Sequence, residues 1–462
     1  MDNAYRRKTT KMKQSINPYN GKKLFEFNTL TENDLESRLK VSHQRYLEWK
    51  ETSFEERSRL MHKAAEQLRQ NKKRYAEIIT LEMGKPISQS LAEVEKCAWV
   101  CEYYAEHAEH QLRDEIIETD AASSYVKYQP LGVILAIMPW NYPFWQVFRF
   151  AAPNLMAGNV GVLKHASNVM QSAEMIQEVF EKAGFPKGCF QNLILDSEQI
   201  KSVIENDIVQ AVTLTGSKPA GASVASIAGA NIKKTVLELG GSNGLIIFDD
   251  ADLDQSVTTC VNARFQNTGQ SCIAGKRLLV HESVADSFTQ KFMDKVKGLK
   301  SGNPLDEQTY IGVMAREDLA QELEQQVKAS IEMGAKLILG GHRKGTYFEP
   351  TILSEVTADM PVFKEETFGP VIGITTFQSD EEAVELSNRS EFGLGVSIFT
   401  EDKNRVKELI GKFNEGAVFV NELVKSDPRL PFGGVKISGY GRELSSHGIK
   451  EFLNKKTVYI KN

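Results

Sequence analysis

From about residue 131 onward the chain alternates short apolar, β-branched runs with longer amphipathic segments. This alternation is typical of strands linked by helices, which build a parallel sheet with helices on both faces. The sequence predicts strands at residues 132–137, 160–164, 190–195, 209–214 and 245–248, and helices at residues 144–156, 169–182 and 219–228. We therefore predict a doubly wound α/β fold.

A second alternating series follows Gly241, with predicted helices at residues 253–266, 284–300 and 318–333 and predicted strands at residues 278–281 and 336–339. Before both series, residues 32–109 are predicted to be helical almost throughout. We infer two Rossmann-like α/β lobes, because each series supplies its own set of strands and covering helices. The predicted cofactor-binding domain comprises residues 1–115 and 131–240, and the predicted catalytic domain comprises residues 241–435.

Two remaining segments, residues 116–130 and 436–462, are assigned to a small β extension that bridges subunits of a homodimer or homotetramer. Polar and β-branched residues alternate in residues 116–130 and again from about residue 455. This pattern indicates exposed strands that need a partner, because an unprotected strand edge invites pairing. From the sequence alone, an ordinary hairpin and a frayed terminus are an equally good interpretation.

The composition argues against several classes of protein. The 462 residues are 41% hydrophobic and 25% charged, with a net charge of −5, so no excess of positive charge favours a nucleic-acid partner. The most apolar stretch, residues 131–140, is about half of the ~20 residues that a membrane-spanning helix needs. The basic residues near the N-terminus precede no apolar signal-peptide core and indicate a solvated tail; they are Arg6, Arg7, Lys8, Lys11 and Lys13.

Five cysteines in a chain of this length form no dense disulfide framework; they are Cys97, Cys101, Cys189, Cys260 and Cys272. We therefore predict a cytoplasmic protein. Cys97 and Cys101 are predicted to share one helix, but no second pair of ligands accompanies them, so burial is the preferred interpretation and no metal is assigned.

Two residues could divide the work of covalent catalysis. Cys272 ends the string NTGQSC, and Glu238 lies in LELGG. A thiolate can attack a carbonyl carbon, and a separate carboxylate can move protons. Either residue alone is weak support, since most cysteines are small buried hydrophobic residues.

The longer strings FQNTGQSCIAGKR and KKTVLELGGSNGLIIFDDADLD resemble the two signature segments of the NAD(P)-dependent aldehyde dehydrogenase superfamily. The resemblance implies that Cys272 attacks an aldehyde and forms a tetrahedral alkoxide, from which hydride leaves to a nicotinamide. Glu238 would then activate the water that hydrolyses the remaining thioester.

Asn141 is predicted to stabilise the oxyanion. It lies in MPWNYP directly after a predicted strand, and its side-chain amide, with the backbone N–H of Cys272, could form an oxyanion hole. Asparagine before Tyr-Pro is also ordinary turn chemistry. The similarity to the superfamily's PWN-P motif favours the catalytic interpretation.

The coenzyme is predicted to be NAD or NADP. The segment TGSKPAG links a predicted strand to a helix, and the resemblance implies that Gly216 and Ser217 there contact the pyrophosphate. It also implies that Lys164 binds the adenosine ribose and that Glu366 holds the nicotinamide ribose, whereas Trp140 and Leu239 line the nicotinamide end.

Ser167 stands where many NAD-preferring members carry a glutamate. A carboxylate there would repel the 2′-phosphate of NADP, so its absence predicts that NADP is tolerated.

Arg149 is the candidate substrate-binding residue. A guanidinium in the apolar segment FWQVFRF needs an anionic partner, which is either a substrate carboxylate or an internal Asp or Glu. From residue 16 to the C-terminus the chain resembles bacterial succinate-semialdehyde dehydrogenases, especially the shorter form, which implies the first role. Gln266 replaces a second substrate arginine of some members, and Lys276, Arg277 and Arg429 are the candidate substitutes for it.

The leading hypothesis is an enzyme that oxidises succinate semialdehyde to succinate. A dehydrogenase for glutarate semialdehyde or another aliphatic aldehyde is the alternative. A CoA-acylating relative is disfavoured by Glu238, and a catalytically silent binding protein is disfavoured by the intact trio of Cys272, Glu238 and Asn141. Because Ala274 occupies the place of a second cysteine used in some members, no redox switch is predicted there.

Overall fold

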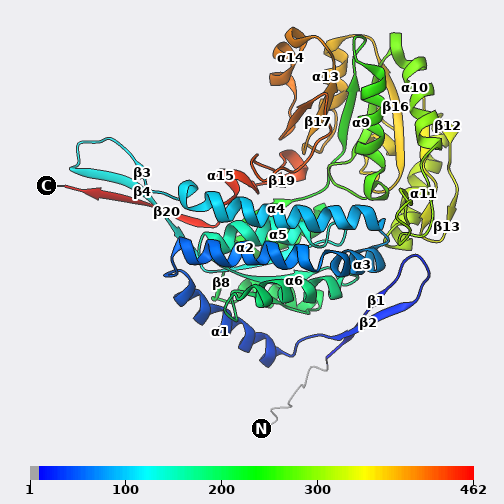
Figure 1. Ribbon diagram of the computed structural model, residues 1–462. Helices are drawn as coiled ribbons and strands as arrows, with labels where there is room; N and C mark the ends of the chain where they lie inside the picture. The colour runs from blue at the N-terminus through cyan, green and yellow to red at the C-terminus, as the bar shows by residue number, and fades with distance from the viewer. Residues whose placement is uncertain (1–9, 462) are drawn as a thin grey trace.

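The computed structural model describes residues 10–461 and has two α/β lobes, a larger body and an upper lobe (Figure 1). The predicted α/β fold is confirmed. Of the basic residues near the N-terminus, Arg6, Arg7 and Lys8 lie outside the described residues. Lys11 and Lys13 are held against the body, since their ammonium groups pair with Asp196 at 3.2 and 2.5 Å.

The body contains a six-stranded sheet that is parallel except for one edge strand. Its strands, in spatial order, are β19 (Gly439–Tyr440), β9 (Lys234–Glu238), β8 (Val209–Thr215), β5 (Val133–Met138), β6 (Val160–His165) and β7 (Phe190–Asn192). Its helices are α1 (Glu32–Trp49), α2 (Phe54–Gln70), α3 (Lys72–Met83), α4 (Ile87–Gln111), α5 (Trp145–Met156), α6 (Met170–Ala183), α7 (Ser197–Glu205) and α8 (Lys218–Ala230). Every residue of β5 and α5 is buried, so these two elements form the centre of the body.

The upper lobe contains a seven-stranded sheet, parallel except where β12 meets β15. Its strands, in spatial order, are β12 (Lys336–Leu339), β15 (Thr351–Ser354), β16 (Val371–Phe377), β11 (Gly275–His281), β10 (Asn243–Ile247), β17 (Val396–Phe399) and β18 (Val418–Val420). The surrounding helices are α9 (Leu253–Phe265), α10 (Glu282–Lys297), α11 (Glu317–Glu332), α12 (Pro361–Lys364), α13 (Asp380–Asn388) and α14 (Lys403–Leu409). A short pair of strands, β13 (Arg343–Lys344) and β14 (Tyr347–Phe348), lies beside it.

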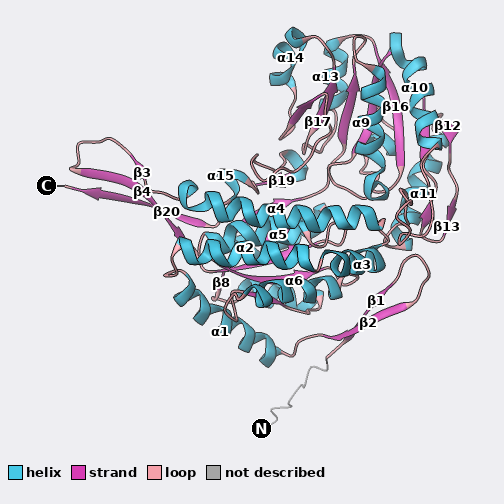
Figure 2. Cartoon of the chain, in the orientation of Figure 1, coloured by secondary structure: helices cyan, strands magenta, loops and turns pink. Residues whose placement is uncertain are grey.

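A small sheet of β3 (Glu115–Ile116), β4 (Ser123–Pro130) and β20 (Leu453–Ile460) projects from the body without helical cover (Figure 2). β4 and β20 pair antiparallel along their full lengths, so the two segments predicted to need partners pair with each other. Ile116 and Tyr459 stay exposed on it. The N-terminal hairpin of β1 (Met12–Ile16) and β2 (Lys23–Asn28) projects separately.

The predicted strands and helices of both series are present, with shifts of a few residues at their ends. Strand β7 is shorter than predicted and ends at Asn192, because the chain turns toward α7. In the two lobes, the elements that were not predicted are helices α7, α12, α13 and α14 and strands β9, β13 to β18 and β19. Among the described residues, no helix is long and apolar enough to cross a membrane. All five cysteines are free.

Candidate active site

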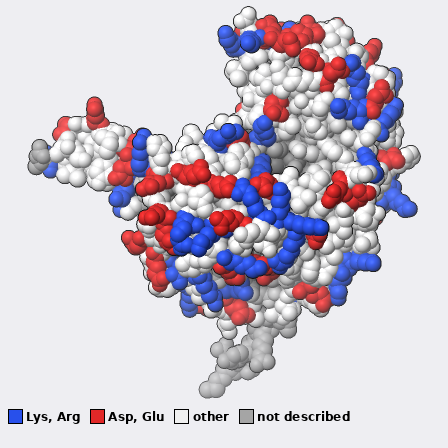
Figure 3. Space-filling view, in the orientation of Figure 1, with Lys and Arg blue, Asp and Glu red and all other residues white. Residues whose placement is uncertain are grey.

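Two of the three predicted catalytic residues lie at the carboxyl ends of parallel strands of the body, where α/β sheets place their ligands, and the third lies just before a strand of the upper lobe. Asn141 follows β5, Glu238 ends β9, and Cys272 lies in the segment that enters β11 of the upper lobe. Figure 3 shows the surface recessed where the upper lobe meets the body. The site is therefore built from both lobes.

The turn before Cys272 has an unusual backbone. Asn267, Thr268 and Gly269 have φ values of 55°, 53° and 72°, and such left-handed conformations are costly for residues with side chains. Hydrogen bonds compensate: the Asn267 side chain donates to the carbonyls of Asn141 and Gln270 at 2.9 and 3.0 Å. The turn is thereby fixed against the loop that follows β5.

Cys272 is the only cysteine of the chain that is not buried. Burial of the thiol itself nevertheless raises its pKa to about 11. The positive charges of Lys276 and Arg149 lower this pKa, and the negative charges of Glu366 and Glu238 raise it. The thiol therefore lies within electrostatic range of both predicted acidic residues.

Glu238 is a buried carboxyl group whose two oxygens have no hydrogen-bond partner among the described residues. Burial raises its pKa well above the usual value, and the charge of Glu443 raises it further, whereas Arg149 and Arg442 oppose the shift. Gly433 lies directly over the carboxyl group, since a Cβ there would stand 2.7 Å from Oε1 of Glu238. A group with these properties can hold or accept a proton near neutral pH.

Asn141 connects the two lobes through its side chain. Its Nδ2 donates to the carbonyl of Gln270 at 3.1 Å, and its Oδ1 accepts from the side chain of Gln146 at 3.1 Å. Its amide N–H therefore points toward the segment that carries Cys272. The loop is further held by His165, whose Nε2 lies 2.9 Å from the carbonyl of Pro143 and whose pKa burial lowers to about 4.

Arg149 is buried and its guanidinium forms an ion pair with Glu443. It also lies 3.4 Å from the Thr215 hydroxyl and over the ring of Phe432. The internal ion pair, one of the two alternatives for this residue, is therefore present in the structure. The substrate-binding role stays a prediction.

The three residues suggested as replacements for a second substrate arginine are bound elsewhere. Lys276 donates to backbone carbonyls and to Glu366, and Arg277 donates to the carbonyls of Leu386 and Ser387. Arg429 is exposed and pairs with Asp427 at 2.7 Å. None of the three has a free guanidinium or ammonium directed at Cys272.

The residues predicted to bind the coenzyme lie along the same edge of the body. Exposed Ser217 is the N-cap of α8, where backbone N–H groups favour a pyrophosphate. Lys164 is the last but one residue of β6, close in sequence to exposed Ser167, and burial lowers the pKa of this lysine. An ammonium, a hydroxyl and a helix N-terminus are donors that suit a dinucleotide phosphate.

The predicted nicotinamide end lies closer to Cys272. The Trp140 ring meets Phe368 edge to face, with centroids 5.7 Å apart, and Leu239 packs against α8, since a Cβ on Gly221 would lie 2.6 Å from it. Glu366 accepts the backbone N–H of Gly241 at 3.0 Å. These positions are compatible with the predicted roles, which stay predictions.

Three residues of the site were not predicted: Glu443, His165 and, as a bonded neighbour of the nucleophile, Lys276. Glu443 lies in the segment PFGGVKISGYGREL, and the need of Arg149 for an anionic partner was the one available signal for it. Nothing in the sequence distinguishes His165 or Lys276 from surface residues.

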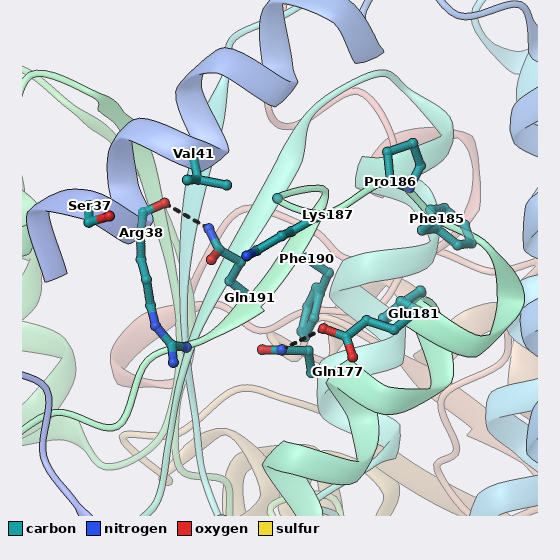
Figure 4. A pocket seen from close by; sticks show the side chains of 12 residues that line it. Ser37, Arg38, Val41, Gln177, Glu181, Phe185, Pro186, Lys187, Phe190 and Gln191 are labelled. Atoms are coloured by element: carbon teal, nitrogen blue, oxygen red, sulfur yellow. Dashed lines mark hydrogen bonds between the residues drawn. The ribbon is translucent and has the colours of Figure 1, made fainter. Parts of the chain in front are cut away.

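A cavity of about 320 Å³ lies between α1, α6 and β7, and none of the predicted residues lines it (Figure 4). Its wall combines Arg38, Lys187 and Glu181 with Phe185. The side chain of Gln191 there donates to the carbonyl of Arg38 at 2.7 Å. Its polar groups are partly bonded to one another, and it is separate from Cys272.

Comparison with known proteins gives consistent matches over nearly the whole chain. Residues 5–458 match the model of the aldehyde dehydrogenase family. A probable succinate-semialdehyde dehydrogenase [NADP(+)] of Synechocystis sp. is 48% identical, over 96% of this chain and 99% of its own length. Succinate-semialdehyde dehydrogenase [NADP(+)] 1 of Mycobacterium tuberculosis is 45% identical over 96% of this chain and 99% of its own length.

Solved structures agree with these matches. The succinic semialdehyde dehydrogenase of Streptococcus pyogenes, in complex with NADP+, superposes with a TM-score of 0.95 at 39% identity, covering 97% of this chain and all of its own. The succinate-semialdehyde dehydrogenase of Burkholderia pseudomallei gives a TM-score of 0.95 at 32% identity, covering 98% of this chain and 95% of its own. On the fold, the signature segments and these matches, the chain belongs to the aldehyde dehydrogenase family.

Proposed function

We propose that this aldehyde dehydrogenase oxidises succinate semialdehyde to succinate with NADP+. The observation that carries the substrate assignment is the buried guanidinium of Arg149, whose charge acts on both Cys272 and Glu238. An aldehyde held at Cys272 would therefore present a carboxylate to a cation that is already desolvated. Such a pairing discriminates strongly against uncharged aldehydes. The names of the relatives at 45–48% identity support the same substrate.

The Arg149–Glu443 ion pair sets a condition on this role. A substrate carboxylate must share Arg149 with Glu443 or replace it. Replacement becomes easier when Glu443 is protonated, and burial raises the pKa of Glu443. Binding of an anionic substrate would thus be linked to the protonation of this carboxyl group.

The chemistry assigned to the chain's own residues has two stages. The thiolate of Cys272 attacks the aldehyde carbon, and the new alkoxide accepts hydrogen bonds from Nδ2 of Asn141 and the N–H of Cys272, each worth about 3–4 kcal/mol. When bound, the coenzyme accepts the hydride that leaves this carbon. Glu238 then takes a proton from water and the hydroxide attacks the thioester; as the C–S bond breaks, the proton passes from Glu238 to the departing sulfur, which restores the Cys272 thiol and releases the acid.

NADP is the proposed coenzyme because of the residues at the end of β6. Lys164 supplies a cation, and Ser167 supplies a hydroxyl where a carboxylate would repel a 2′-phosphate. The domain boundaries, the homodimer or homotetramer and the cytoplasmic localisation stay predictions. The exposed edge of the β3–β4–β20 sheet is the surface we expect an assembled partner to cover.

The test compares kcat/KM for succinate semialdehyde, glutarate semialdehyde and butanal, with NADP+ and NAD+, in the native chain and in Arg149→Met. We expect succinate semialdehyde with NADP+ to be the best pair. Arg149→Met should lower kcat/KM for this substrate about a hundredfold and change it little for butanal, since truncating one side of a buried charge pair costs roughly 2–5 kcal/mol.

Arg57→Met is the matched control. Arg57 is another buried arginine, but it donates to the carbonyls of Met156, Trp49 and Lys50. It should lower thermal stability without changing the ratio between the two aldehydes. Equal losses for both aldehydes in Arg149→Met, or a preference of the native chain for butanal, would contradict the substrate assignment. Stimulation of turnover by CoA would contradict hydrolysis by water.

A further inference from the structure

Lys276 is a completely buried lysine directly behind the nucleophile, and its bonds to protein acceptors leave it unavailable for the substrate-binding role suggested by the sequence. Its side chain has an exposed fraction of 0%, and it is the second residue of strand β11. Burying an ammonium costs several kcal/mol unless hydrogen bonds and an opposite charge compensate. The burial of this ammonium group must therefore be compensated by its surroundings.

The ammonium of Lys276 contacts four acceptors from three segments. It lies 2.8 and 3.0 Å from the carbonyl oxygens of Ser271 and Cys272, and 2.5 Å from that of Gly241. The fourth acceptor is Oε1 of Glu366, at 2.9 Å. The lysine therefore joins the nucleophile's own backbone to the LELGG segment and to the residue predicted to hold the nicotinamide ribose.

Two glycines permit this close approach. A Cβ at Gly241 would stand 2.5 Å from the carbonyl oxygen of Cys272, and a Cβ at Gly240 would stand 2.3 Å from Oε2 of Glu366. Both distances are far inside van der Waals contact. The LELGG segment is thus shaped so that Cys272, Lys276 and Glu366 can meet around one point.

We propose that Lys276 is a positioning residue that holds Cys272 in place and provides the main fixed positive charge favouring its thiolate. A neutral donor would serve for positioning alone, whereas the charge also acts on the sulfur. Among the groups that lower the pKa of the Cys272 thiol, Lys276 has the largest effect, ahead of Arg149. This inference rests on the proposed nucleophilic role of Cys272, but its test requires no aldehyde.

Other charges face the same two groups. Arg149 on α5, Glu238 at the end of β9 and Glu366 after α12 act on the thiol, and Tyr142 in the loop after β5 lies within range of it. Lys276 itself faces Glu366, which raises its pKa, and Arg264 on α9, which lowers it. Burial lowers the pKa of Lys276, and the ion pair with Glu366 opposes this shift and favours the charged ammonium.

The test measures the rate of alkylation of Cys272 by iodoacetamide against pH, in the full chain without coenzyme. The other four cysteines are buried, so the reaction reports Cys272, and peptide mass confirms the site. Lys276→Met removes the charge and keeps the length of the side chain. We expect its alkylation midpoint to rise by about one pH unit or more, which makes alkylation about tenfold slower near neutral pH.

Two further variants separate charge from packing. Lys276→Arg keeps the charge and should restore most of the native midpoint. Arg277→Met is the matched control, because Arg277 is the adjacent buried cation on β11 but bonds to the carbonyls of Ser242, Leu386 and Ser387. We expect no shift of the midpoint in this control.

An unchanged midpoint in Lys276→Met would overturn the proposal. So would an arginine variant that behaves like the methionine variant while remaining folded by circular dichroism. If Lys276→Met fails to fold because Glu366 is left unpaired, the double variant Lys276→Met/Glu366→Gln removes both charges and is compared with Glu366→Gln. A higher midpoint in the double variant supports the charge effect, and equal midpoints reject it.

Discussion

The two sides of Cys272 differ in how their buried charged groups are bonded. On one side, Lys276 contacts three carbonyl oxygens and one carboxylate. On the other side, the oxygens of Glu238 have no hydrogen-bond partner among the described residues, and those of Glu443 have only the ion pair with Arg149. Fully bonded groups hold a geometry, whereas unpaired buried groups are where water or a substrate has something to gain by binding. We infer that the Lys276 side holds Cys272 in position, and that the Glu238 side carries the groups that exchange protons or bind substrate.

The largest effect is expected at the residue between the two sides. Cys272→Ser should lower kcat by at least about 10⁴-fold, because a serine hydroxyl ionises far less readily than a thiol and is a much weaker nucleophile near neutral pH. The measurement is NADPH formation from succinate semialdehyde. The variant should keep the native thermal unfolding midpoint, because it replaces only the sulfur atom of Cys272 by oxygen. Substantial remaining oxidation would refute covalent attack by this residue.

Glu238→Gln should remove the general base on one side of Cys272 and leave the Lys276 hydrogen bonds on the other side unchanged. We expect kcat to fall about 10²–10⁴-fold, the usual contribution of a general base. Attack by Cys272 should still occur, so one equivalent of NADPH should form rapidly and a thioester should accumulate on the enzyme. Rapid mixing and intact-protein mass spectrometry test this. Loss of the rapid phase would mean that Glu238 is needed before hydrolysis.

Glu443→Gln should change only the Glu238 side of Cys272, and its effect on the kinetics should be smaller than that of the two preceding variants. The charge of Glu443 raises the pKa of Glu238, so its removal should lower that pKa and move the rising limb of the kcat profile to lower pH. It should also free Arg149 for the substrate and lower KM for succinate semialdehyde several-fold, with no change for butanal. If KM rises for both aldehydes, Glu443 instead holds the shape of the pocket.

Much of the fold followed from sequence patterns that local physics determines. The buried β-branched runs that became β5, β6, β8 and β10 were identifiable because both faces of a parallel sheet are covered. Strands β16 and β17 were not predicted, because Gly373 and Ser397 interrupt their apolar runs. The pairing of β4 with β20 depends on segments far apart in the chain, so each could be recognised as an exposed strand but not matched to the other.

In the site, too, features set by the local sequence were predictable, and those that depend on distant segments were not. Cys272, Glu238 and Asn141 were recognisable from short motifs, because their chemistry restricts the residues beside them. The partner of Arg149 was not, since an ion pair with Glu443 depends on how the last part of the chain packs against α5. Lys276 was considered only as a substrate ligand. Its bonds to backbone carbonyls are not reflected in any pattern of side chains. Its position behind the nucleophile could therefore be identified only from the structure.

The return of the chain to the body through β19 has a consequence for how this enzyme can be divided. β19 completes the first sheet by pairing with β9 at Leu237 and Glu238, and it does so only after the whole upper lobe has been traversed. A fragment ending near residue 240 would leave β9 as an unpaired edge strand that can pair with other chains. It would also lack Gly433, which lies over the Glu238 carboxyl group. The two lobes are therefore poor candidates for separate expression and recombination, and the base should become shielded late in folding.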